Sequence, residues 1–150
     1  DVPFFLQDNP ALAAGRGEII KPQKPFTALQ GKGLLLIHPG FGVSTPWAYH
    51  AFTASGDYGN KGAAASMLEA LSAGRLDGLA NSLEAPVFSK YTVLPVIKNF
   101  LADHGALVAL MTGSGSTMFA LTENRPAAET LRAQYHAHFG PSGWSATVAL

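Results

Sequence analysis

The segment 106–121 constrains the fold of this chain more than any other part of the sequence. It reads ALVALM, TGSGST and MFAL, so two short apolar runs flank a turn of Gly, Ser and Thr. This pattern predicts a β-hairpin that is closed by a glycine-containing loop. Gly113 and Gly115 permit backbone angles that other residues avoid, and Ser114 adds a hydroxyl group between them. Such a loop is either a plain turn or one wall of an anion-binding site.

Three further segments read as strands. The run GLLLIHP at 33–39 holds four consecutive apolar residues closed by His38 and Pro39, which predicts a strand that is buried on both faces of a sheet. A turn at 15–17 separates two shorter strands, the second of which we expect to end before Pro22. At the end of the chain, 144–150 alternates between apolar and other residues, as a strand does.

The remaining segments carry helical patterns. Thr45 is a suitable N-cap for a helix with Pro46 in its first position. Apolar spacing and the Pro and Gly residues that flank it predict further helices at 63–71, 77–83, 92–104 and 126–139. Helices do not alternate regularly with strands along the chain. We therefore predict an α+β fold, in which a mostly antiparallel sheet carries helices packed on one face.

Composition bounds the size and the surface of the molecule. The 150 residues are enough for one domain with its own core. Only 13% of them are charged, against a usual share of about 25%, which predicts that part of the surface is hidden against something else. The sequence also begins at Asp1 without a Met, and its first residues are typical of the middle of a protein. We interpret the chain as a fragment, or one processed part, of a longer protein.

Several classes of function are disfavoured. Ten basic and ten acidic residues cancel without a basic cluster, so we expect no nucleic-acid partner. No apolar run reaches membrane length and no signal-peptide pattern opens the sequence, so we expect no membrane partner and a cytoplasmic location. The chain has no Cys, and its five His residues lack zinc-site spacing, so no metal ligands are predicted.

The glycine segment 112–116 also fails the spacing of three known catalytic or nucleotide-binding motifs. It is not the Gly-x-Ser-x-Gly elbow of serine hydrolases, and the text that follows it is strand rather than helix. No Lys follows its last Gly, as a Walker-type phosphate loop requires. The dinucleotide-binding pattern Gly-x-Gly-x-x-Gly is absent too.

Four motifs occur together in one order: DVPFFL at 1–6, GRGE at 15–18, LLIHPGFGVSTPWAY at 35–49 and MTGSGSTMFAL at 111–121. So arranged, they resemble the C-terminal part of the galactokinase–homoserine kinase–mevalonate kinase–phosphomevalonate kinase (GHMP) superfamily. The resemblance covers nearly the whole chain. The His-Pro-Gly and Ser-Thr-Pro text is most similar to the branch that phosphorylates 4-diphosphocytidyl-2-C-methyl-D-erythritol in non-mevalonate isoprenoid synthesis.

The resemblance implies roles for individual residues. The Asp of Asp-Val-Pro is the catalytic acid of the superfamily, so Asp1 would take or orient the proton of the substrate hydroxyl that attacks the γ-phosphate of ATP. Thr45 would supply a polar contact to the cytidine part of the substrate, and Tyr49 an aromatic face for its cytosine ring. The competing interpretation of this pair is a helix cap and a core side chain. The loop residues that would present N–H groups to the phosphate region are Gly113, Ser114 and Gly115.

The resemblance also implies what lies elsewhere. Members of the superfamily hold ATP, with Mg²⁺, on a glycine-rich loop and helix upstream of the Asp, so the missing N-terminal half would be a partner of this chain. Residues 1–25 would end the N-terminal kinase domain and 26–150 would form the C-terminal domain. We expect this chain alone to be inactive and to bind neither cofactor. Two alternatives stay open, namely a non-catalytic interaction module and a GHMP kinase that acts on another small alcohol.

Overall fold

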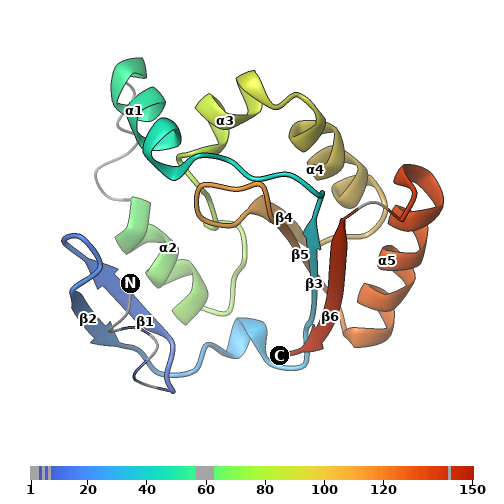
Figure 1. Cartoon of the computed structure of the whole chain (residues 1–150). Coiled ribbons are helices and arrows are strands. Elements are labelled where there is room, and N and C mark those ends of the chain that lie inside the picture. Colours follow the sequence, from blue (N-terminus) through green and yellow to red (C-terminus); the bar gives the residue numbers. More distant parts are fainter. Residues whose placement is uncertain (1–3, 5, 7, 57–62, 142) are drawn as a thin grey trace.

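A four-stranded antiparallel sheet forms the centre of the molecule (Figure 1). The computed structural model describes residues 4, 6, 8–56, 63–141 and 143–150. The strands lie in the order β4-β5-β3-β6, and their bounds are β3 Gly33–His38, β4 Val108–Met111, β5 Met118–Thr122 and β6 Trp144–Ala149. β4 and β5 form the hairpin predicted from the sequence, with Met111 opposite Met118 at its loop end.

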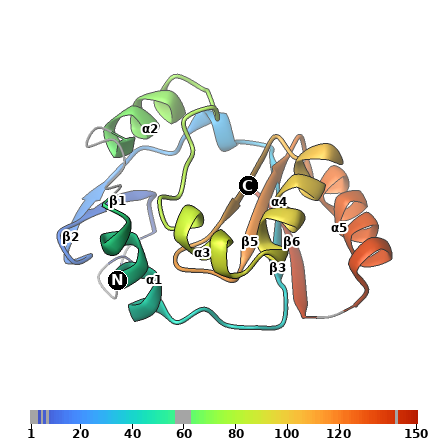
Figure 2. The same ribbon diagram turned by 90° about the horizontal axis from the view of Figure 1, so that it is seen from above.

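Two helices cover one face of this sheet (Figure 2). They are α4 (Val93–Asp103) and α5 (Arg125–Phe139). Leu35 and Ile37 of β3 are fully buried in the core beneath them. The main core side chains that the two helices contribute are Leu94, Ile97, Leu101, Leu131 and Tyr135. The predicted α+β class with an antiparallel sheet is confirmed.

The second face of the sheet has looser packing. Leu34 and Leu36, which alternate with the buried residues of β3, are only half-buried. On this side lie the short helix η2 (Thr27–Leu29) and α2 (Ala63–Ser72), with an apolar cavity of about 320 Å³ between them and the sheet. The cavity is lined by Leu29, Leu34, Leu36, Leu71, Leu79, Thr112, Phe119, Leu121 and Leu150.

A separate two-stranded sheet precedes this domain core. β1 (Ala11–Ala14) pairs with β2 (Ile19–Pro22), and the predicted turn at 15–17 joins them. The second strand includes Pro22, where the sequence pattern predicts that it has already ended. Pro22 is tolerated because it is a terminal residue of an edge strand, where no backbone donor is needed.

Two details of the predicted helices are wrong, namely the N-cap at Thr45 and the helix at 77–83. α1 (Thr45–Ser55) begins as expected around Pro46, but its N-cap is Ser44, whose hydroxyl accepts a hydrogen bond from the Trp47 N–H at 3.4 Å. No helix forms over 77–83; the helix of this region is α3 (Glu84–Lys90). Pro86 lies within the first turn of α3, a position where the missing N–H has no helical partner to lose.

Among the described residues, no helix combines the length and the apolar character that a membrane crossing requires.

Candidate functional site

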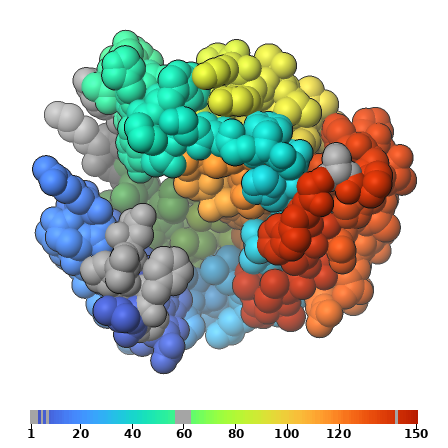
Figure 3. All heavy atoms as spheres, viewed as in Figure 1, coloured from blue at the N-terminus to red at the C-terminus, as the bar shows by residue number. Residues whose placement is uncertain are grey.

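The segment that follows β3 lies against the loop of the β4–β5 hairpin. The hydroxyl groups of Thr45 and Ser114 are 2.7 Å apart, although 69 positions separate the two residues in the sequence. The Ser116 hydroxyl donates to the carbonyl of Phe41 in the same segment. Figure 3 shows this segment, in turquoise, packed over the hairpin, in orange. The structure therefore brings together two motifs that the sequence presents far apart.

The hairpin loop holds a narrow turn with open backbone donors. The Thr112 N–H donates to the Thr117 carbonyl at 2.9 Å, and the Gly115 N–H donates to the Thr112 carbonyl at 3.0 Å. Gly113 and Gly115 have φ angles of 57° and 84°, which side-chain-bearing residues rarely adopt. Within the described part of the chain, the N–H groups of Gly113 and Ser114 have no hydrogen-bond acceptor. Adjacent unpaired N–H groups of this kind can bind an anion.

Tyr49 lies one helical turn beyond Thr45 on α1. Residues four apart share a helix face, so Tyr49 is on the side of α1 that carries Thr45. Its side chain is 58% exposed, which contradicts the alternative that Tyr49 is a core side chain. An exposed ring beside a polar group can stack on a flat ligand.

Trp47 has a different role from Tyr49. Its ring lies edge-on to Tyr91 with centroids 5.8 Å apart, and the Lys90 ammonium is 4.0 Å from the ring centroid. Tyr91 also stacks on Phe41, with centroids 5.5 Å apart. This aromatic group fixes α1 and the β3–α1 segment against α3. Trp47 is therefore a packing residue.

Asn81 and Glu84 support the hairpin loop from the side of α3. Asn81 donates to the carbonyls of Met111 and Gly113, and Glu84 accepts from the Met111 N–H. The sequence reasoning missed both residues because the contacts span 27 to 32 positions, which local spacing does not report. An Asn in the loop before a proline-containing helix marks a turn-capping residue, but that signal does not identify the loop as its partner.

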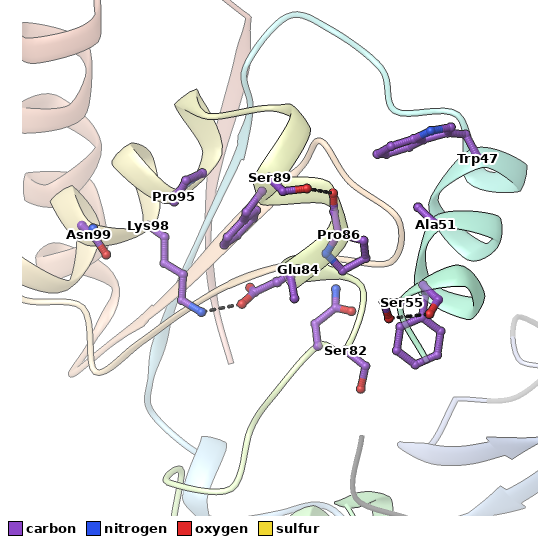
Figure 4. Close-up of a pocket in the computed structure, with 14 residues that line it drawn as sticks. Trp47, Ala51, Ser55, Ser82, Glu84, Pro86, Ser89, Pro95, Lys98 and Asn99 are labelled. Atoms are coloured by element: carbon purple, nitrogen blue, oxygen red, sulfur yellow. Dashed lines mark hydrogen bonds and ion pairs between the residues drawn. The ribbon is translucent and has the colours of Figure 1, made fainter. Parts of the chain in front are cut away.

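A groove of about 870 Å³ lies between α1, α3 and α4 (Figure 4). Trp47 and Ala51 line it from α1, and Lys98 lines it from α4. Glu84 and Lys98 form an ion pair on its wall, with Glu84 the more deeply buried partner.

Burial raises the pKa of the Tyr135 phenol in the core of the sheet and α5, outside this groove.

The predicted catalytic Asp1 lies outside the described residues. Of the other predicted site residues, Thr45 and Ser114 are in contact, Tyr49 shares the face of Thr45, and Gly113 and Gly115 flank Ser114. No cluster of three His, Asp or Glu side chains that could hold a metal ion occurs among the described residues.

Comparison with known proteins identifies the family of this chain. The family model of the GHMP kinase C-terminal domain matches residues 50–141. A 4-diphosphocytidyl-2-C-methyl-D-erythritol kinase of Methylacidiphilum infernorum (isolate V4) is 43% identical over 147 residues, which are 96% of this chain and 48% of that protein. A protein of the same name from Pelobacter propionicus is 37% identical, over 99% of this chain and 50% of that protein.

Solved structures show the same relationship. The crystal structure of a 4-(cytidine 5'-diphospho)-2C-methyl-D-erythritol kinase matches with a TM-score of 0.74 and 34% identity, over 98% of this chain and 52% of that chain. This chain thus spans about half the length of the curated relatives that it matches. The resemblance inferred from the four sequence motifs is confirmed, and the chain belongs to the GHMP kinase family, whose C-terminal domain it matches.

Proposed function

We propose that this chain is the C-terminal, substrate-binding part of an ATP-dependent kinase that phosphorylates 4-diphosphocytidyl-2-C-methyl-D-erythritol for isoprenoid synthesis. The observation that carries this proposal is the 2.7 Å contact between Thr45 and Ser114. It joins the helix that presents Tyr49 to the loop that presents open N–H groups. An aromatic face beside anion-binding donors suits a cytidine diphosphate group, and the names of the relatives contain that group.

Each part of the site has a role in this proposal. Tyr49 stacks on the cytosine ring, and the Thr45 hydroxyl makes a polar contact with the cytidine. The N–H groups of Gly113 and Ser114 bind phosphate oxygens, which carry the negative charge. When the substrate hydroxyl attacks the γ-phosphate, its proton passes to the carboxylate of Asp1 and adenosine diphosphate leaves. Positioning and charge stabilisation supply most of the rate in such transfers.

The proposal assigns ATP to a second part of the protein. Residues 1–25 complete that N-terminal kinase domain, and 26–150 form the C-terminal domain. We infer that the 150 residues alone catalyse no transfer, since ATP is bound elsewhere. The described side chains offer no cluster for Mg²⁺, so none of them is assigned to that ion. A reaction that consumes ATP and a soluble small molecule is consistent with a cytoplasmic location.

The test is a chimera in which this chain replaces the matching half of the Methylacidiphilum infernorum relative. We expect the chimera to transfer phosphate from ATP to 4-diphosphocytidyl-2-C-methyl-D-erythritol, and the 150-residue chain alone to transfer none. Mevalonate and homoserine serve as competing substrates, because the chain could belong to a GHMP kinase for another small alcohol. A folded chimera that phosphorylates either of these and not the cytidine substrate contradicts the proposal.

One observation favours the second candidate, a non-catalytic interaction module. The half-buried Leu34 and Leu36 and the apolar cavity beside them could receive further protein. A folded chimera that is inactive and also does not bind cytidine diphosphate in calorimetry would support this candidate over the kinase.

A further inference from the structure

We propose that Asn81 is a positioning residue for phosphate binding, because it sets the direction in which the Ser114 N–H points. This inference rests on the proposed function, since it concerns the donors that would meet the diphosphate group. Asn81 is half-buried, in the segment before α3, and contacts the hairpin loop without belonging to it.

The hydrogen bonds of Asn81 determine its orientation. Its Nδ2 group donates to the Met111 carbonyl at 2.7 Å and to the Gly113 carbonyl at 2.8 Å. Its Oδ1 accepts from the Leu83 N–H at 2.9 Å. The opposite amide orientation would place an oxygen against two carbonyl oxygens and an NH₂ group against an N–H. Only one orientation therefore satisfies all three contacts.

The contact with Met111 places Asn81 at the outer side of an edge strand. β4 has a strand neighbour on one side only, so the outward groups of its last residue need other partners. Asn81 takes the Met111 carbonyl, and Glu84 Oε1 takes the Met111 N–H at 2.7 Å. Lys98 holds the other carboxylate oxygen of Glu84 (Figure 4). The start of the loop is thus anchored through both backbone groups of one residue.

The contact with the Gly113 carbonyl determines the direction of the Ser114 N–H group. The peptide bond between Gly113 and Ser114 is trans, so its C=O and N–H point in opposite directions. Because the Gly113 carbonyl points at Asn81, the Ser114 N–H points away from Asn81. The Ser114 hydroxyl, in turn, is held by Thr45. Asn81 and Thr45 therefore fix Ser114 from two sides and leave its N–H as the open donor.

The experiment compares Asn81→Ala with Asn99→Ala in the 150-residue chain. Asn99 lines the same groove from α4 and is exposed, and its side chain makes no hydrogen bond among the described residues, so its loss removes an amide without touching the loop. The probes are cytidine diphosphate and cytidine, titrated by calorimetry. We expect Asn81→Ala to weaken cytidine diphosphate binding about tenfold, the effect of one misdirected hydrogen bond to a charged group. Cytidine affinity stays unchanged, as do both affinities in Asn99→Ala.

Two outcomes overturn the inference. One is equal cytidine diphosphate affinity in the Asn81 and Asn99 variants. The other is an equal loss of affinity for both probes in Asn81→Ala, which indicates general damage to the fold.

Asn81→Asp is the second variant. Its carboxylate repels the two carbonyls at neutral pH, and protonation at acidic pH restores one O–H donor. Its cytidine diphosphate affinity relative to the unsubstituted chain should therefore recover as the pH falls while its cytidine affinity stays unchanged, whereas a purely structural defect would lower both affinities.

A measurement without ligand separates this inference from the proposed function. If the unsubstituted chain binds neither probe, the assignment of a cytidine diphosphate site to these 150 residues fails, whereas the kinase activity itself is decided by the chimera. The role of Asn81 is then decided by nuclear magnetic resonance of the ligand-free chain. A change in the Ser114 amide resonance in Asn81→Ala and not in Asn99→Ala supports the positioning role, and an unchanged resonance overturns it.

Discussion

Tyr49 is the residue at which the proposed cytidine site can be tested most directly. We expect Tyr49→Ala to weaken cytidine diphosphate binding about tenfold, because a stacked aromatic ring contributes roughly 1–3 kcal/mol per base. Stability should change by less than about 0.5 kcal/mol, since the side chain is mostly exposed. Calorimetry checks the first expectation and urea unfolding the second.

The matched control for this prediction is Tyr49→Phe, which keeps the ring and loses only the hydroxyl. It should bind cytidine diphosphate as the unsubstituted chain does. An alanine variant with undiminished affinity would exclude cytosine stacking on Tyr49 and would favour a substrate without a cytidine group.

Gly115 and Gly113 form a second matched pair at the scale of the residue. A Cβ atom at Gly115 would lie 2.5 Å from Met111 Sδ, whereas one at Gly113 would have open space around it. Both residues have positive φ, so alanine is strained at either position. We expect Gly115→Ala to lower the free energy of unfolding by about 1–3 kcal/mol more than Gly113→Ala, through overpacking against the core. Urea unfolding measures both, and equal losses would contradict the expectation.

The residues of the candidate site show where sequence reasoning succeeds and where it stops. The motif resemblance selected Thr45 and Ser114, and the structure places their hydroxyl groups in contact. Asn81 escaped notice because its importance lies in backbone carbonyls about 30 positions away. Every residue has a backbone carbonyl, so a side chain that binds carbonyl groups has no partner of a particular residue type that the sequence could reveal. The functional roles themselves stay predictions.

At the scale of the element, patterns that are local were predicted well. The strand β3 and the β4–β5 hairpin can be predicted from the residues within them. Gly105 and Gly140 follow the ends of α4 and α5 with positive φ angles, as glycines at helix ends often do. The helix predicted at 77–83 is wrong, because a proline just beyond an apolar segment does not show whether a helix ends before it or begins around it. In the structure Pro86 lies inside the first turn of the helix that follows.

Helix caps give a prediction at this scale. The Asn124 side chain accepts from the Ala127 N–H at 3.0 Å at the start of α5, whereas the Ser44 cap of α1 is longer, at 3.4 Å. We expect Asn124→Ala to cost about 1 kcal/mol of stability and Ser44→Ala to cost less. Thermal and urea unfolding of the two variants check the order. A larger loss for Ser44→Ala would contradict it.

At the scale of the whole molecule, the two faces of the sheet differ in how completely they are covered. Leu35 is fully buried beneath α4 and α5, and its neighbour Leu36 is half-buried beside the apolar cavity. We expect Leu35→Ala to lower the free energy of unfolding by about 2–5 kcal/mol. Leu36→Ala should cost less, because less of its surface leaves water on folding. Urea unfolding compares the two, and equal costs would contradict the difference in packing.

The uneven coverage also bears on the low charge content of the chain. Composition alone predicts that part of the surface is hidden against something else, and the less densely packed face supplies an apolar region suited to that. Which face it would be could not be predicted, because the run GLLLIH is apolar on both of its sides. The burial difference arises from tertiary packing, where α4 and α5 fill one side and η2 and α2 leave a cavity on the other.

The anchoring of Met111 by Asn81 and Glu84 has a consequence for how the molecule behaves at high concentration. An edge strand with free backbone groups can add a strand from another chain and so begin aggregation. At the loop end of β4 these groups are already bonded to side chains. The opposite edge is β6, and 144–150 contains no charged residue that would repel a second copy. The bonds of Met111 therefore protect the loop end of β4 from strand addition, and no charged residue gives β6 a comparable protection.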